Sequence, residues 1–137
     1  MANKKKRKKT EQKPVKKYLN LIYMTPSQIR AKDIATLLEN TDGITVEVWN
    51  EMDVLELEFS NANTVDFESL DLSFSDPSDL TFIKNHKIQT IFAIQLLEED
   101  FSYVKPILEK IVVEYRGFVC ADTENFQPVL LGSLNGH

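Results

Sequence analysis

The feature that most constrains the fold is an alternation of inward apolar side chains with a second, mostly polar set between Ile44 and Phe59, in which Trp49 and Val54 are the apolar members of the second set. Successive side chains of a β-strand point to opposite faces, so a period of two predicts half-buried strands. The alternation stops only at Asn50–Asp53, which we interpret as the turn of an antiparallel hairpin. Such a hairpin needs a sheet with one buried and one solvated face.

The pairing register of this hairpin points to candidate binding residues. If the turn closes on Trp49 and Val54, Glu47 faces Glu56 across the strands, and Glu58 lies on the same outward face. Like charges directly opposite each other are unfavourable, so we expect a cation to compensate them. An aromatic ring beside acidic side chains has the composition of a binding hot spot for Arg or Lys. We therefore predict Trp49, Glu47, Glu56 and Glu58 as binding residues; the alternative is a solvated face whose Trp covers a helix or the turn.

Other apolar segments predict the remaining strands. Ile88–Leu97 is apolar on both faces, as expected for the core strand of the sheet. Tyr18–Met24 and Phe118–Ala121 predict two more buried strands. Residues 60–66 are interpreted as a loop, and the alternation from Leu70 to Phe74 predicts a further strand or edge segment. Val129 to Leu131 is interpreted as a docked extension.

Three segments carry helix signals. Thr25 followed by Pro26 predicts an N-cap and first turn, and Gly43 a stop. Ser75 or Asp76, followed by Pro77, predicts a short helix that ends near Asn85. The acidic run 98–100 predicts the start of a long helix that ends before Gly117, with Pro106 within about the first turn.

This order of elements predicts an α+β fold. The simplest arrangement is an antiparallel or mixed sheet with two main helices on one face, a ferredoxin-like or split βαβ plan with an insertion. A chain of 137 residues fits one such domain.

Charge divides the chain into two parts. Residues 1–17 hold nine of the sixteen Lys and Arg and only one acid, which predicts a disordered basic arm. Residues 18–137 hold seven bases and twenty acids, which predicts a single acidic domain. A basic N-terminus without an apolar core is not a signal peptide, and no run is long enough to span a membrane. With one cysteine and therefore no internal disulfide, we expect a cytoplasmic location.

The residue inventory argues against several chemistries. The four glycines match no phosphate-binding motif, and one cysteine with two histidines cannot supply a structural zinc site. Cys120 lacks a neighbouring base and is interpreted as a buried strand residue. The clusters 98–100 and 122–124 could meet at one end of the sheet, but helix-start acids and a loop turn explain them better. We expect no enzyme, cofactor or metal site.

The leading hypothesis is a non-catalytic module of the inhibitor, immunity-protein or adaptor type that captures a basic protein partner through its acidic surface. One alternative is a small-molecule-binding regulatory domain of ferredoxin-like type. Another is a nucleic-acid-associated protein whose arm, residues 4–17, makes weak and non-specific phosphate contacts. The arm could instead cover the acidic face of its own domain.

Overall fold

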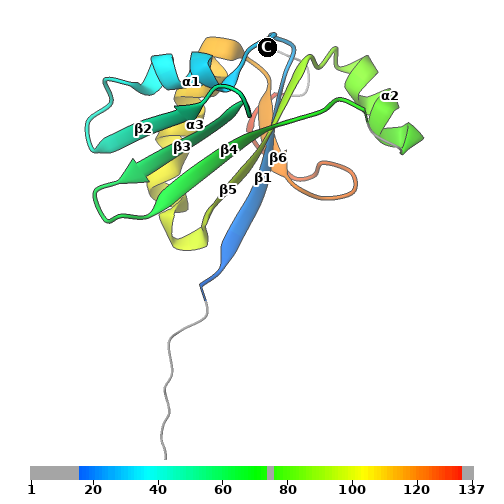
Figure 1. Ribbon diagram of the computed structural model, residues 1–137. Helices are drawn as coiled ribbons and strands as arrows, with labels where there is room; N and C mark the ends of the chain where they lie inside the picture. Colours follow the sequence, from blue (N-terminus) through cyan, green and yellow to red (C-terminus); the bar gives the residue numbers. More distant parts are fainter. Residues whose placement is uncertain (1–15, 74–75, 134–137) are drawn as a thin grey trace, which may run out of the picture.

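The computed structural model describes residues 16–73 and 76–133. In it, the alternating segment from Ile44 to Phe59 forms one edge of a seven-stranded antiparallel sheet. Across these residues the chain is α+β, with three α-helices beside the sheet (Figure 1). The elements are β1 (Tyr18–Thr25), α1 (Ala31–Leu38), β2 (Ile44–Trp49), β3 (Val54–Phe59), β4 (Thr64–Leu70), α2 (Pro77–Asn85), β5 (Thr90–Leu97), a short 3-10 helix (Glu98–Asp100), α3 (Phe101–Tyr115), β6 (Phe118–Ala121) and β7 (Val129–Gly132).

The strand order is β2-β3-β4-β5-β1-β6-β7, and every neighbouring pair is antiparallel. The predicted core strand is confirmed as β5, which pairs with β1 from Tyr18↔Leu97 to Thr25↔Thr90. The α+β class and the antiparallel sheet are therefore confirmed. The ferredoxin-like plan is not confirmed, because the β2–β3 hairpin and β7 make this sheet larger than that plan contains.

The two faces of the sheet are buried to different extents. On one face, α1 and α3 pack on a large core that includes Ile34, Leu55, Phe67 and Val104, each without exposed surface (Figure 1). On the other face, a smaller cluster contains Met24, Ile83, Ile91, Phe118, Cys120 and Phe126. The smaller cluster involves α2 and the loop before β7. It reaches the end of β4 through Leu70 and leaves the rest of the outer surface of β2, β3 and β4 uncovered.

The predicted start of the first helix is wrong, because the helix begins at Ala31 rather than at Pro26. Thr25 belongs to β1, where its hydroxyl donates to the Tyr115 carbonyl at 2.6 Å and accepts from the Ser27 amide at 3.0 Å. These bonds tie the residue to the end of α3. A local capping signal was thus overridden by a partner 90 residues away in the chain.

The segment after the hairpin also differs from the prediction. Residues 60–66 are not all loop, because β4 begins at Thr64, and the predicted strand from Leu70 is instead the end of β4. Val65 and Phe67 are fully buried while Asp66 and Glu68 face outward, so the alternation starts earlier than we inferred. Phe74 lies outside the described residues.

The remaining predicted elements have mixed outcomes. The short helix is confirmed as α2, with the Asp76 carboxylate accepting from the Ser78 amide. The strand Phe118–Ala121 is confirmed as β6, and the docked extension is the edge strand β7. Pro106 lies in the second turn of α3 rather than the first.

The predicted basic arm, residues 1–17, lies outside the described residues except for Lys16 and Lys17. The Lys17 carbonyl accepts a hydrogen bond from the Glu98 amide at 2.8 Å. None of the helices in the described part of the chain has the length and apolar character needed to cross a bilayer.

The turn between β2 and β3 is fastened to α1 by Asp53. Its carboxylate accepts from the Ala31 amide at 2.6 Å and lies 3.8 Å from the Arg30 guanidinium. Arg30 also donates to the Asn50 carbonyl at 3.0 Å. Asp53 has a φ of 56°, the left-handed region that Asn and Gly tolerate best.

We expect Asp53→Gly to lower the free energy of unfolding by about 1 kcal/mol, because it removes the helix cap while keeping the backbone conformation accessible. Asp53→Asn, which keeps an oxygen acceptor and tolerates the same φ, should retain most of this stability. Urea unfolding followed by circular dichroism measures both values. Equal stability of Asp53→Gly and the wild type would show that the carboxylate does not hold the turn.

Candidate protein-binding face

The outer surface of β2, β3 and β4 contains the four residues predicted from the sequence. The register is the predicted one, with Trp49 opposite Val54 and Glu47 opposite Glu56. Glu58 lies two residues further along β3, opposite Thr45.

The row of acids continues onto β4. Glu56 also faces Asp66, and Val54 faces Glu68. We call the outer-surface residues Glu47, Glu56, Glu58, Asp66 and Glu68 the acidic face.

The side chains of the acidic face are accessible rather than covered by a helix. Trp49 is 38% exposed at the turn end of β2, and Glu47, Glu58 and Glu68 are exposed. Glu56 and Asp66, in the middle of the row, are half-buried. The helices α1 and α3 lie on the opposite side of the sheet (Figure 1). An indole ring and several carboxylates are therefore presented together.

Glu56 is the electrostatic centre of this face. Partial burial raises the pKa of its carboxyl, and the hydrogen bond and charge of Asp66 and the charges of Glu47 and Glu58 raise it further. All the charged groups that act on Glu56 are acidic, so the compensating cation predicted from the sequence is not found among the residues that the structure describes. The acidic face is thus under mutual repulsion, which a cationic group from outside would relieve.

A shallow hollow continues the acidic face toward the centre of the sheet. It has a volume of about 210 Å³. Ala93 and other central-strand residues line it together with Asn20, Asp66, Glu68, Gln95 and Asp122. The Gln95 amide donates to the Asn20 side-chain oxygen at 3.3 Å, so the two amides are oriented by each other. Three carboxylates around a small concave surface suit a Lys or Arg side chain.

Sequence reasoning missed the residues of this hollow for two reasons. The alternation Val65-Asp66-Phe67-Glu68 is present in the sequence, but the predicted loop 60–66 included Asp66 and no predicted strand contained Glu68, so neither acid was assigned to the outer surface. Gln95 is a polar interruption of an apolar strand, which is a usable signal. Its juxtaposition with Asp66 required the strand order, which no local pattern provides.

The two acidic clusters considered for catalysis do not form one site. Asp100 is buried, at 2% exposed, and its carboxylate accepts from the Asn63 side-chain amide at 2.9 Å. Asp122 instead lines the hollow on the outer surface. Within residues 16–73 and 76–133, no three or more His, Cys, Asp or Glu side chains are grouped so that they could hold a metal ion.

Cys120 lies fully buried in β6. Burial, followed by the charge of Asp122, raises the pKa of its thiol to about 12, so the thiol is protonated at neutral pH. His86 ends α2 and its ring packs 4.4 Å from that of Phe82. The cysteine and the histidine therefore belong to the smaller core cluster or its border.

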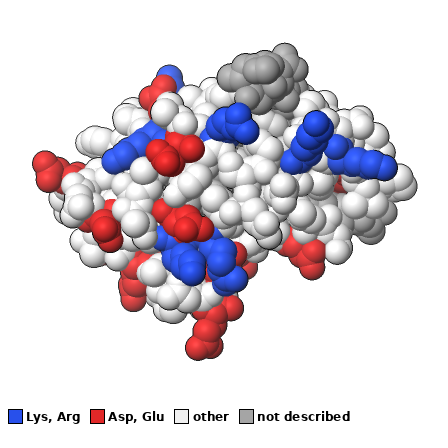
Figure 2. All heavy atoms as spheres, turned by 90° about the horizontal axis from the view of Figure 1, so that it is seen from above, with Lys and Arg blue, Asp and Glu red and all other residues white. Residues whose placement is uncertain are grey.

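Charge is unevenly distributed over the molecule. Figure 2 shows the protein from above, turned by 90° about the horizontal axis from the view of Figure 1. Acidic side chains project along the left and lower margins of this view. The basic side chains in this view lie in several small groups, some at the right-hand side and others directly beside acidic side chains.

We expect Glu56→Gln to raise the free energy of unfolding at pH 7 by about 0.2 to 0.5 kcal/mol, since it removes one charge from the repulsive row. A raised pKa means that the folded state disfavours the ionised carboxyl, so the cost appears as pH rises through that pKa. At pH 3, where the carboxyl is protonated in folded and unfolded chains, the difference should vanish. Urea unfolding at both pH values measures the free energy of unfolding of the variant and of the wild type. The control is Glu109→Gln, which removes a charge from the exposed surface of α3 instead.

A pH-independent difference between Glu56→Gln and the wild type would contradict the electrostatic explanation.

Comparison with protein-family models, with curated proteins and with solved structures found no match for this chain.

Proposed function

We propose that this protein is a non-catalytic binding module that captures a basic protein partner on the acidic face, as an inhibitor, an immunity protein or an adaptor does. The observation that carries the proposal is the row of carboxylates centred on Glu56, which no cation of the described residues compensates, with Trp49 exposed at its end. Keeping like charges adjacent opposes folding, and a cationic partner would turn this cost into binding free energy.

Three parts of the surface have separate roles in this proposal. Trp49 is the anchor, because an indole ring binds Arg or Lys through its face and buries a large area at little entropic cost. The hollow beside Asp66 and Asp122 receives a second cationic side chain. Glu47 and Glu58 steer the partner by long-range attraction.

The pKa of Glu56 adds a pH dependence to this mechanism. A bound cation favours the ionised carboxylate and so lowers the raised pKa of Glu56; at a pH where Glu56 is protonated in the unbound protein, binding releases that proton. The affinity for the cationic partner should therefore increase as pH rises through the pKa of Glu56 in the unbound protein.

The proposal also includes the type of fold and the cellular location of the protein. We interpret the four adjacent strands β4, β5, β1 and β6 as a ferredoxin-like core, to which β2, β3 and β7 are additions. A cytoplasmic location accords with a single, buried cysteine.

A charge-reversal variant tests the acidic face. We expect full-length protein carrying Trp49→Ala, Glu47→Lys, Glu56→Lys and Glu58→Lys to bind a fluorescent arginine–glycine repeat peptide at least about tenfold more weakly than wild type. Fluorescence anisotropy at several salt concentrations measures the affinity. Circular dichroism establishes that the variant is folded.

The matched control changes the same number of acids on other surfaces: Glu39→Lys, Glu109→Lys and Glu114→Lys, all at exposed positions of α3 or the end of α1. The control should keep most of the affinity at physiological ionic strength, where distant charges are screened. Equal losses in the two variants would show that the peptide senses only net charge, and the proposed site would be wrong.

A further inference from the structure

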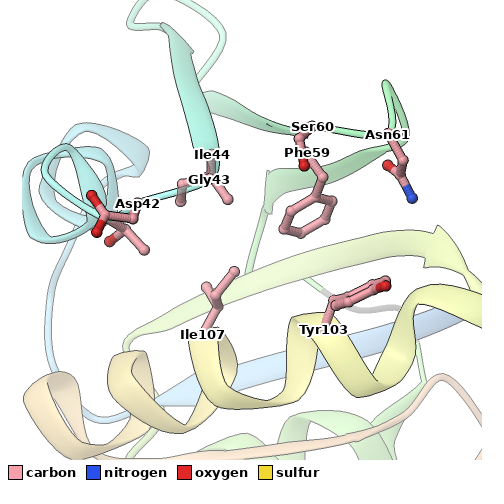
Figure 3. A pocket seen from close by; sticks show the side chains of 9 residues that line it. Asp42, Gly43, Ile44, Phe59, Ser60, Asn61, Tyr103 and Ile107 are labelled. Carbon is pink, nitrogen blue, oxygen red and sulfur yellow. The ribbon is translucent and has the colours of Figure 1, made fainter.

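A second pocket lies on the opposite side of the sheet from the acidic face. It has a volume of about 370 Å³, within the size range of small-molecule sites. Its walls are the loop between α1 and β2, the end of β3 with the following turn, and the beginning of α3 (Figure 3).

Apolar side chains form the body of the pocket. Ile44 and Phe59 extend from the sheet toward Ile107 and Tyr103, which extend from α3 to meet them across the open space (Figure 3). The rings of Phe59 and Tyr103 lie 6.5 Å apart between centroids and are inclined at 36°. Tyr103 is 64% exposed, so much of its surface has no packing partner. The interiors of proteins are normally close-packed, so this open space is unusual. An aromatic ring of a ligand would fill it and stack on the rings of Phe59 and Tyr103.

Oxygen atoms supply the polar groups of the lining. Asp42 lies at one end of the pocket and Asn61 at the other, with Ser60 beside Phe59 (Figure 3). The hydroxyl oxygen of Thr41, a further lining residue, is buried and has no hydrogen-bond partner among the residues that the structure describes. Rotation of the Thr41 side chain toward a ligand would therefore sacrifice no existing hydrogen bond. Neither Lys nor Arg is among the residues that line the pocket, so the lining favours hydrogen-bond donors and cations over anions.

The walls of the pocket are held in place by the fold. The turn after β3 closes through hydrogen bonds from the Phe59 amide to the Asn63 carbonyl and from the Ala62 amide to the Phe59 carbonyl, both 2.9 Å. The same turn is fastened to the start of α3 by the bond between Asn63 and the buried Asp100. A site with fixed walls loses little entropy when a ligand binds.

We propose that this pocket binds a small planar aromatic molecule that carries an ammonium group. The ring occupies the space between Phe59, Tyr103 and Ile107, and the ammonium group extends toward the negatively charged end of the pocket that Asp42 forms. The site is separate from the acidic face and does not depend on the proposed function.

The test uses tryptamine as the probe and indole-3-acetate as a ligand with the same ring and the opposite charge. In two-dimensional NMR of the full-length, ¹⁵N-labelled protein, we expect tryptamine to shift the amide signals of residues 41–44 and 59–61 in a saturable manner. Indole-3-acetate should bind about five- to tenfold more weakly, because Asp42 and the net negative domain repel it.

Two variants of α3 separate the pocket from the rest of the surface. Tyr103→Ala should weaken tryptamine binding about three- to tenfold, the value of one aromatic contact. Val113→Ala, at an 82% exposed position of the same helix, should leave it unchanged. The charge-reversal variant of the acidic face should also keep the pocket shifts, so failure of the proposed function would not be mistaken for failure of this site.

Three results would overturn the inference. They are an absence of saturable shifts, equal affinity for the two indole compounds, and tryptamine shifts that map to β2–β4 around Trp49 instead of to the pocket.

Discussion

The antiparallel pairing of β1 with β5 is the constraint on which the rest of the structure depends. The two strands are joined along their whole length, from Tyr18↔Leu97 to Thr25↔Thr90, and they lie between the hairpin side of the sheet and the β6–β7 side. Both strands are apolar on both faces at the end where α2 lies, so the pairing also connects the two hydrophobic clusters. Without it, β2–β4 and β6–β7 would be separate ribbons, each too small to bury a core alone.

The helices α1 and α3 cover one face of the sheet and leave part of the other face open, and this difference connects the fold with the proposed function. Since α1 and α3 cover one face and build the large core there, the domain has a core that does not need the outer surface of β2–β4. That surface is consequently free to keep adjacent carboxylates, which oppose stability by a modest amount. Natural proteins commonly tolerate such local costs where a surface serves binding.

How far the sequence predicts this structure depends on the range of the interactions involved. The hairpin register is confirmed pair by pair, because the alternation and the turn length are local properties of residues 44–59. The predicted start of α1 was wrong because the Thr25 hydroxyl donates a hydrogen bond to the Tyr115 carbonyl, and the sequence near Thr25 holds no sign of that contact. Likewise, the four outer-surface residues follow from the register alone, whereas the hollow beside Asp66 needs the order β4-β5-β1. The pocket beneath Phe59 needs the placement of α3, which no periodicity contains.

The position of Glu47 has a consequence for the solubility of the protein. Among the strands that the structure describes, β2 forms one edge of the sheet, and an edge strand offers unpaired amide and carbonyl groups to any other extended chain. If two copies met edge to edge along β2, the glutamates of both would be brought into proximity, in addition to those already crowded on β3. Electrostatic repulsion between copies thus protects the open edge from self-association, while a segment rich in Arg or Lys would meet no such barrier.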